Sequence, residues 1–282
     1  MAEEKKKLKA YESLEFLHSP DARLIRIMSE YVEPEARFRK LNVWDTIVFF
    51  GSARLLPRKD ALKNYNKIKS SDPKSTPNFA EQLRKSQVLL DMSKYYEDAV
   101  ELSLRITRWS IDLGLDEKRF IVCTGGGPGL MEAANKGAKA AGGYSVGLNI
   151  SLPFEQSGNK YVTQQLSFDF HYFFMRKFWF AYLAKALVAF PGGFGTMDEL
   201  FEILTLVQTL KIKKKLSIVV YDEKYWKSLV NWDTLVEHGM INKEDLDLFK
   251  FCNTVDEAYD VITKHLEKYY LKRRRAESPI SL

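Results

Sequence analysis

A glycine-rich turn with the sequence Pro-Gly-Gly-Phe-Gly-Thr at residues 191–196 constrains the fold of this chain more than any other segment. The apolar run at 186–190 predicts a buried strand before the turn, and apolar residues at helical spacing in 200–210 predict a helix after it. A strand that passes directly into a helix is the repeating unit of α/β proteins. Because the first N–H groups of a helix have no partner within the helix, and because glycine lets a ligand approach them, this unit predicts an anion site.

The rest of the chain continues this alternation of strands and helices. Strands are predicted at 46–50, 119–124, 144–150 and 216–221, a short extended segment at 165–168, and helices at 78–113, 130–140, 171–184, 225–238 and 255–270. Such an alternation is typical of a parallel sheet covered on both faces. The sequence therefore predicts an α/β fold with a Rossmann-like, doubly wound parallel sheet.

Three segments are expected along the chain. Residues 1–43 predict a helical N-terminal extension, residues 44–270 the Rossmann-like nucleotide-binding domain, and residues 271–282 a mobile basic tail. The prolines of 55–77 predict a loop inserted into the domain. The most apolar region, 172–190, contains three cations, which disfavours a membrane span. Since no apolar segment follows the N-terminal lysines, a secretory signal is also disfavoured, and we expect a cytoplasmic protein.

Small residues stand at the ends of three predicted strands, at 51–52, 125–129 and 192–196. Taken singly, each loop is as consistent with a tight turn as with a ligand contact. Ligands of doubly wound sheets bind at the carboxyl ends of strands, so three such loops on one edge predict a site for a nucleotide-sized ligand. The loop at 125–129 departs from G-x-G-x-x-G at Leu130, and the chain contains no P-loop pattern. A dehydrogenase and a P-loop ATPase are therefore disfavoured, and a single nucleotide or sugar phosphate is the expected ligand.

Two charged residues each have a structural and a chemical interpretation. Glu199 completes a Thr-x-x-Glu capping box with Thr196, but a carboxylate beside a phosphate also suits chemistry on the rest of the ligand. Arg176 lies in the aromatic segment 171–184, where it either extends to the surface or faces the site and meets a phosphate or Glu199. A cation in apolar surroundings needs an anionic partner. The pattern alone leaves both pairs of alternatives open.

The charge and the cysteines indicate little about partners. The 43 lysines and arginines against 37 acidic residues give a formal net charge of +6, but two of the three basic clusters lie near the termini, where they are typical of solvated tails. Binding to nucleic acid is therefore disfavoured. Two cysteines far apart, Cys123 and Cys252, and four scattered histidines predict neither a disulfide framework nor a metal site.

Three motifs together resemble the Lonely Guy (LOG) family over residues 44–222. They are Gly-Gly-Gly-Pro-Gly-Leu-Met-Glu at 125–132, Met-Arg-Lys at 175–177 and Pro-Gly-Gly-Phe-Gly-Thr-Met-Asp-Glu at 191–199. The resemblance implies a phosphoribohydrolase, in a family some of whose members carry the older name lysine decarboxylase. Such an enzyme hydrolyses the N-glycosidic bond of a nucleoside 5′-monophosphate, here AMP or an N6-modified AMP, to the free base and ribose 5-phosphate. It implies no cofactor and no metal, and a homodimer or larger homo-oligomer.

Carried over by position, the resemblance assigns Arg176 and Glu199 as the catalytic pair. The further positions expected to contact substrate are Lys177, Gly192, Gly193, Phe194, Gly195, Thr196, Asp198, Thr205 and Glu155, and the other two loops add Ser52, Gly126 and Gly127. A carboxylate can stabilise the positive charge that develops on the ribose, and the arginine can keep it ionised. The alternative is a non-catalytic nucleotide-sensing or nucleic-acid-associated Rossmann-like protein, which would not need the Arg176 and Glu199 pair.

Overall fold

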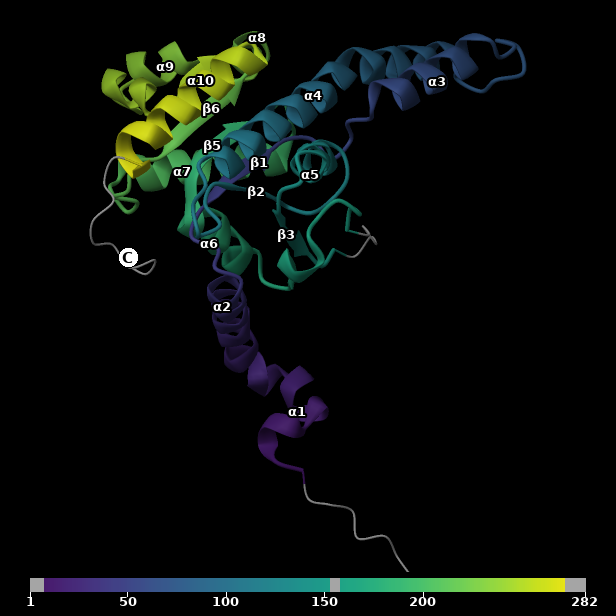
Figure 1. The fold of residues 1–282 in the computed structure, drawn as a ribbon. Helices are drawn as coiled ribbons and strands as arrows, with labels where there is room; N and C mark the ends of the chain where they lie inside the picture. The colour runs from purple at the N-terminus through teal and green to yellow at the C-terminus, as the bar shows by residue number, and fades with distance from the viewer. Residues whose placement is uncertain (1–7, 153–157, 272–282) are drawn as a thin grey trace, which may run out of the picture.

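A seven-stranded sheet with only parallel pairings forms the centre of the protein (Figure 1). The computed structural model describes residues 8–152 and 158–271. Its strands are β1 (Thr46–Phe50), β2 (Ile121–Thr124), β3 (Ser145–Ile150), β4 (Ser167–Phe170), β5 (Ala184–Ala189), β6 (Ser217–Tyr221) and β7 (Lys250–Cys252). The order is β4-β3-β2-β1-β5-β6-β7, so the chain builds outward from β1 in both directions. The predicted Rossmann-like, doubly wound sheet is confirmed.

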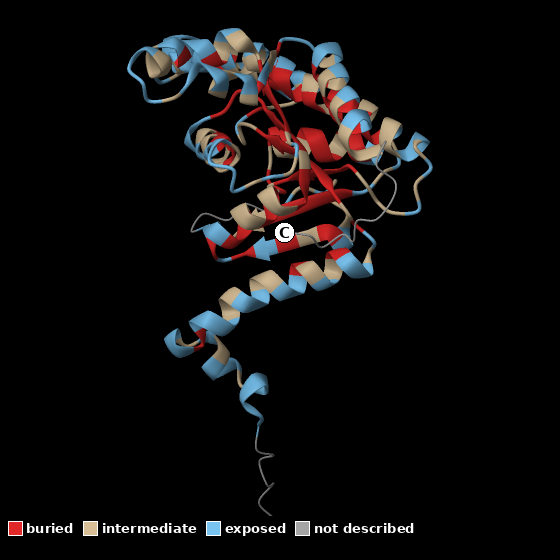
Figure 2. Ribbon diagram, turned by 90° about the vertical axis from the view of Figure 1, so that its left-hand side faces the viewer, coloured by how far each residue is buried: buried red, intermediate tan, exposed pale blue. Residues whose placement is uncertain are grey.

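Helices cover both faces of the sheet because successive residues of each strand point to opposite sides. On one face lie α4 (Phe79–Asp112), α5 (Leu130–Ala140) and α10 (Val255–Leu266), and on the other α6 (Phe173–Leu183), α7 (Phe194–Gln208), α8 (Glu223–Leu229) and α9 (Trp232–Glu237). In β1, Ile47 and Phe49 pack in the core between the sheet and α4, α5 and α10. Val48 and Phe50 pack in the core on the opposite face, under α6 to α9. Figure 2 shows how the buried residues concentrate in these strands.

The described N-terminal residues are helical, as predicted. They form α1 (Leu14–His18) and α2 (Arg23–Lys40), with single 3₁₀ turns at Ala10–Glu12 and Pro20–Ala22. These helices extend away from the body of the molecule (Figure 1), and the C-terminal part of α2 packs on the core through the buried Phe38. Residues 272–282, which make up nearly all of the predicted tail, lie outside the described residues.

The loop predicted at 55–77 is wrong, because residues Arg58–Lys69 form the helix α3, which packs on α4. Pro57 stands just before the first residue of α3, where the absence of its N–H breaks no hydrogen bond. The helix predicted at 225–238 is two helices, since Asn231 caps a new helix after the extended Val230. Strand β7 had no signal in the sequence. In the described part of the chain, no helix has the length and apolar character needed to cross a membrane.

Further short elements complete the chain. Single 3₁₀ helices occupy Gln164–Leu166 and Lys243–Leu248, and a π-helical turn at Glu267–Leu271 follows α10. The capping box predicts a helix that begins just after Thr196, but α7 begins at Phe194. This earlier start matters for the site, because it changes the position that Thr196 and Glu199 hold in the helix.

Candidate active site

The loops after β1, β2 and β5 meet at the carboxyl edge of the sheet, where the strand order reverses. The N–H of Ser52 donates to the carbonyl of Pro191 at 3.2 Å, and the carbonyl of Ser52 accepts from the N–H of Leu130 at 3.0 Å. Gly129 has φ +69°, and a Cβ there would lie 2.5 Å from backbone atoms of Ser52 and Ala53. Glycine is therefore required for this close approach. The three loops that the sequence singled out form one site, at the position where doubly wound sheets bind ligands.

The turn into α7 presents open backbone donors. Gly193 is the N-cap of α7, and within the described chain no side chain caps it. Gly193, Phe194 and Gly195 are exposed, and a Cβ added to either glycine would meet no described heavy atom within 4 Å. The other side of the turn is closed, because a Cβ on Gly192 would lie 2.1 Å from the hydroxyl oxygen of Thr196. The first N–H groups of α7 thus face open space that an anion can occupy.

The capping interpretation of Glu199 is wrong. Since α7 begins at Phe194, Thr196 is the third residue of the helix and not its N-cap. The side chain of Glu199 instead forms an ion pair with Arg176, with 2.8 Å between Oε1 and Nη1. Both side chains are largely buried, at 9% exposure for Arg176 and 13% for Glu199. The interpretation of Arg176 as a residue that extends to the surface is therefore wrong as well.

Arg176 lies beside two aromatic rings and the second glycine loop, and one of its N–H groups has no hydrogen-bond partner among the described residues. Its guanidinium carbon lies 5.2 Å from the centre of the Phe173 ring and 5.1 Å from that of Phe180. A Cβ on Gly125 would lie 3.8 Å from Nη1, which places the arginine beside the second glycine loop. Among the described residues, the buried Nε has no hydrogen-bond partner. A buried donor of this kind is costly unless a ligand satisfies it.

Burial raises the pKa of the Glu199 carboxyl above its ordinary value, and the attraction of Arg176 offsets part of this increase. Asp198 on α7 raises the pKa of Glu199 further, whereas Lys177 on α6 lowers it. Cys123 of β2 lies near the pair, and burial together with the Glu199 charge raises the pKa of its thiol. Glu199 is thus a carboxylate in a poorly solvated site with an arginine as its counter-ion.

Lys177 and Asp198 lie together beside this pair, but they bind each other. The ammonium of Lys177 lies 2.8 Å from a carboxylate oxygen of Asp198 and 2.9 Å from one of Glu202. In the described structure, no contact joins Thr205 to Arg176 or Glu199. The hydroxyl of Thr205 donates to the carbonyl of Phe201 at 2.8 Å. Glu155 lies outside the described residues.

The carbonyls of Gly126 and Gly127 both accept from the side-chain amide of Asn159, at 3.0 and 2.9 Å. The hydroxyl of Ser52 accepts from the N–H of Arg54 at 3.1 Å. These contacts shape the second and first loops around the pair. The structure therefore brings Arg176, Glu199 and the three loops together, while the hydroxyl of Thr205 is used within its own helix.

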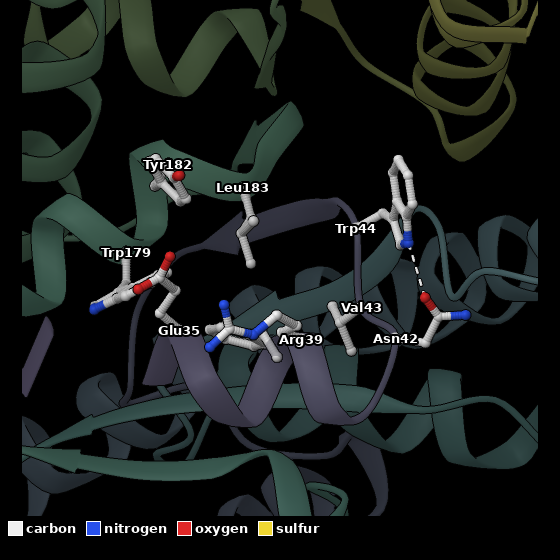
Figure 3. A pocket seen from close by; sticks show the side chains of 9 residues that line it. Glu35, Arg39, Asn42, Val43, Trp44, Trp179, Tyr182 and Leu183 are labelled. Carbon is white, nitrogen blue, oxygen red and sulfur yellow. Dashed lines mark hydrogen bonds between the residues drawn. The ribbon is translucent and has the colours of Figure 1, made fainter. Parts of the chain in front are cut away.

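A cavity of about 120 Å³ lies elsewhere, between α2 and α6 (Figure 3). It is lined by Glu35, Phe38, Arg39, Asn42, Val43, Trp44, Trp179, Tyr182 and Leu183. Trp44 lies two residues before the start of β1, and Leu183 directly precedes β5, so the cavity lies at the amino edge of the sheet. It is therefore separate from the site formed by the glycine loops.

Comparison with known proteins identifies the family. A family model described as "Possible lysine decarboxylase" matches residues 131–262. A cytokinin riboside 5′-monophosphate phosphoribohydrolase of Arabidopsis thaliana is 29% identical over 180 residues, which are 63% of this chain and 76% of that relative. A protein of Oryza sativa subsp. japonica named "Probable cytokinin riboside 5′-monophosphate phosphoribohydrolase" is 31% identical over 163 residues, which are 56% of this chain and 68% of that relative. The chain belongs to the Lonely Guy family. Arg176 and Glu199 both fall inside the segment that the family model matches.

Solved structures are similar to this Lonely Guy family chain at lower identity. The molybdenum cofactor carrier protein of Chlamydomonas reinhardtii is 20% identical with a TM-score of 0.41, and the match covers 79% of this chain and 98% of that one. The molybdenum cofactor binding protein of Rippkaea orientalis is 15% identical with a TM-score of 0.45, and 78% and 96% of the two chains are covered.

Two residues of this Lonely Guy family site had no signal in the sequence. Asn159 holds the second loop through its side-chain amide, and Tyr225 donates its hydroxyl to the carbonyl of Gly192 at 2.8 Å. Each contact joins residues more than 30 positions apart. Neither belongs to a recognisable motif, so only the folded chain reveals them.

Proposed function

We propose that this protein hydrolyses the N-glycosidic bond of a nucleoside 5′-monophosphate, with AMP or an N6-modified AMP as substrate. The buried ion pair of Arg176 and Glu199 beside the open start of α7 carries this proposal. A nucleotide-binding protein without catalysis would need the open helix start but not a buried carboxylate next to it. The names of the Arabidopsis and rice relatives support the same reaction.

The geometry suggests a role for each part of the site. The N–H groups at the start of α7 bind the 5′-phosphate, which anchors the ribose beside the ion pair. As the bond from C1′ to the base nitrogen breaks, positive charge develops on the ribose, and the Glu199 carboxylate stabilises it. The oxygen of a water molecule then bonds to C1′, one of its protons passes to the departing base, and the other remains on the new hydroxyl. Arg176 keeps Glu199 ionised, and its free Nε donates to the substrate.

The direct test is to incubate the purified protein with AMP, GMP, CMP, UMP and N6-isopentenyl AMP, and to detect the released base by chromatography. Adenosine and ATP serve as controls. We expect release from a monophosphate and not from adenosine, because adenosine lacks the phosphate that the turn binds. Absence of release from every monophosphate, together with a ligand-induced rise in melting temperature, would favour the nucleotide-sensing alternative instead.

The pH dependence of kcat/KM follows from the environment of Glu199. Because the pKa of Glu199 is raised, protonation begins at a higher pH than for an ordinary glutamate. Activity that needs the ionised form is then fully present above this raised pKa and is lost as the pH falls through it. We expect kcat/KM, measured between about pH 4 and 8, to fall on the acid side with a midpoint above the ordinary glutamate range of about 4.3. A midpoint at or below that range would contradict Glu199 as the group that titrates.

We also propose that the active form is a homodimer or larger homo-oligomer. Phe173 and Phe174 at the start of α6 and Phe194 at the start of α7 are 49%, 52% and 90% exposed. Large exposed apolar side chains that form a continuous patch are typical of a contact surface. We expect light scattering to give at least twice the mass of the chain, and Phe194→Ser to shift the equilibrium toward the monomer. A monomeric wild-type protein would contradict this proposal.

A further inference from the structure

The helix that carries Arg176 begins without a cap of its own. In the described structure, the N-cap of α6 is Tyr172, which makes no side-chain capping hydrogen bond. The carboxylate of Glu30, on α2, accepts from the N–H of His171 at 2.7 Å and from that of Tyr172 at 3.2 Å. A carboxylate at the start of a helix also interacts favourably with the helix dipole. Glu30 thus binds, from a distant part of the chain, the two residues that directly precede the first turn of α6.

A second hydrogen bond joins the same turn of α2 to α6. The indole N–H of the buried Trp179 donates to the backbone carbonyl of Glu30 at 2.9 Å. Arg176 lies between Tyr172 and Trp179 in the sequence, so α2 binds α6 on both sides of the arginine. At the other end of α6, the ammonium of Lys214 donates to the carbonyls of Ala181 and Tyr182 at 2.6 and 2.7 Å.

Part of the boundary between α2 and α6 is open. Figure 3 shows the cavity there, with Glu35 and Arg39 of α2 on one side and Tyr182 and Leu183 of α6 on the other. A cavity contributes none of the close contacts by which packed side chains fix two helices. Aromatic contacts of Tyr31 and Phe38 with Trp179 join the two helices beside the cavity, and the hydrogen bonds of Glu30 add polar contacts at the start of α6.

We propose that Glu30 is a positioning residue, which fixes the start of α6 and thereby holds the guanidinium of Arg176 against Glu199. The link is short, because the N–H of Arg176 donates to the carbonyl of Tyr172 at 3.2 Å in the first turn of the helix. A displacement of Tyr172 therefore moves Arg176. The catalytic part of this inference rests on the proposed function. It makes the N-terminal helical region part of the support of the active site.

The test uses Glu30→Ala and Glu30→Gln in the full chain, with Glu33→Gln as the matched control. Glu33 lies one turn further along α2 and pairs with Arg37 at the surface. The bond from Trp179 uses the backbone of residue 30, so both variants keep it. Glutamine retains one acceptor oxygen, so we expect a smaller effect than with alanine. Circular dichroism first establishes that each variant is folded.

Two measurements are made on each variant. In Glu30→Ala, we expect amide hydrogen exchange of residues 171–176 to become roughly tenfold faster. With the monophosphate that the wild type hydrolyses, we expect kcat to fall about tenfold while KM changes less than about threefold, since the phosphate-binding turn on α7 is untouched. In Glu33→Gln, both exchange and kcat stay at the wild-type level.

A pH profile separates positioning from a purely structural role. Arg176 and Lys177 of α6 lower the pKa of Glu199, while Asp198 of α7 raises it, and Cys123 of β2 lies nearby. If Arg176 moves away, we expect the acid midpoint of kcat to shift to higher pH in Glu30→Ala. General loss of stability would lower the melting temperature without this shift.

The outcomes also separate this inference from the proposed function. Wild-type exchange rates at 171–176 in Glu30→Ala, or an unchanged kcat in a folded variant, would overturn the inference. If the wild type releases no base from any monophosphate, the proposed function fails. The exchange measurement then still decides whether Glu30 fixes the start of α6.

Discussion

Glu199→Gln is expected to lower kcat by about 10³-fold or more while the protein stays folded. Glutamine has the shape of glutamate and can still accept a hydrogen bond from Arg176. It lacks the negative charge that would stabilise the developing charge on the ribose. The measurement is base release at saturating monophosphate, alongside circular dichroism and the melting temperature.

The matched control for this substitution is Glu81→Gln. Glu81 pairs with Lys85 on the surface of α4 and belongs to no part of the site. We expect its kcat to equal that of the wild type. If Glu199→Gln retained most of its activity, the carboxylate would not take part in the reaction, and the proposed mechanism would be wrong.

Arg176→Met is expected to lower both activity and stability. It leaves Glu199 as a buried carboxylate without its counter-ion, and breaking a buried pair in this way costs about 3–5 kcal/mol. The loss in the free energy of unfolding should be largest at neutral pH. It should become smaller in acid, where protonation of Glu199 removes the unpaired charge. Urea unfolding at several pH values measures it, and kcat should fall at least about 10²-fold.

The double variant Arg176→Met, Glu199→Gln makes this prediction sharper. With the charge of residue 199 also removed, we expect the free energy of unfolding to recover by more than half of what the single Arg176→Met change loses. Activity should not recover. A double variant as unstable as the single one would show that the arginine stabilises the protein through its packing with Phe173 and Phe180 rather than through its charge.

Much of the fold could be predicted because it depends on local patterns. Strand β1 has the predicted bounds, since a strand buried on both faces contains a nearly continuous apolar run, here Ile47 to Phe50. Helix α3 was missed because the prolines near its ends suggested a loop. Strand β7 was missed because three residues carry too little pattern to be seen.

For the site, the sequence predicted the loops but not the contacts between distant residues. The three glycine loops could be predicted, because a close approach of two backbone segments requires small residues, and these are visible in the local sequence. The choice between a cap and a catalytic group at Glu199 could not be made, because its partner Arg176 lies on another helix. The roles of Glu30, Asn159 and Tyr225 could not be found for the same reason. Their contacts exist only once distant segments are folded together.

The ion pairs of Lys177 with two carboxylates bear on which nucleotides the proposed site binds. Lys177 faces two carboxylates, those of Asp198 and Glu202, so this group of three carries one negative charge in total. Asp198 lies within about one turn of the start of α7, where the phosphate would bind. Each further phosphate on a nucleoside adds charge of the same sign close to this group. If the phosphate binds at the start of α7 as proposed, we expect this group to disfavour nucleoside di- and triphosphates more strongly than monophosphates.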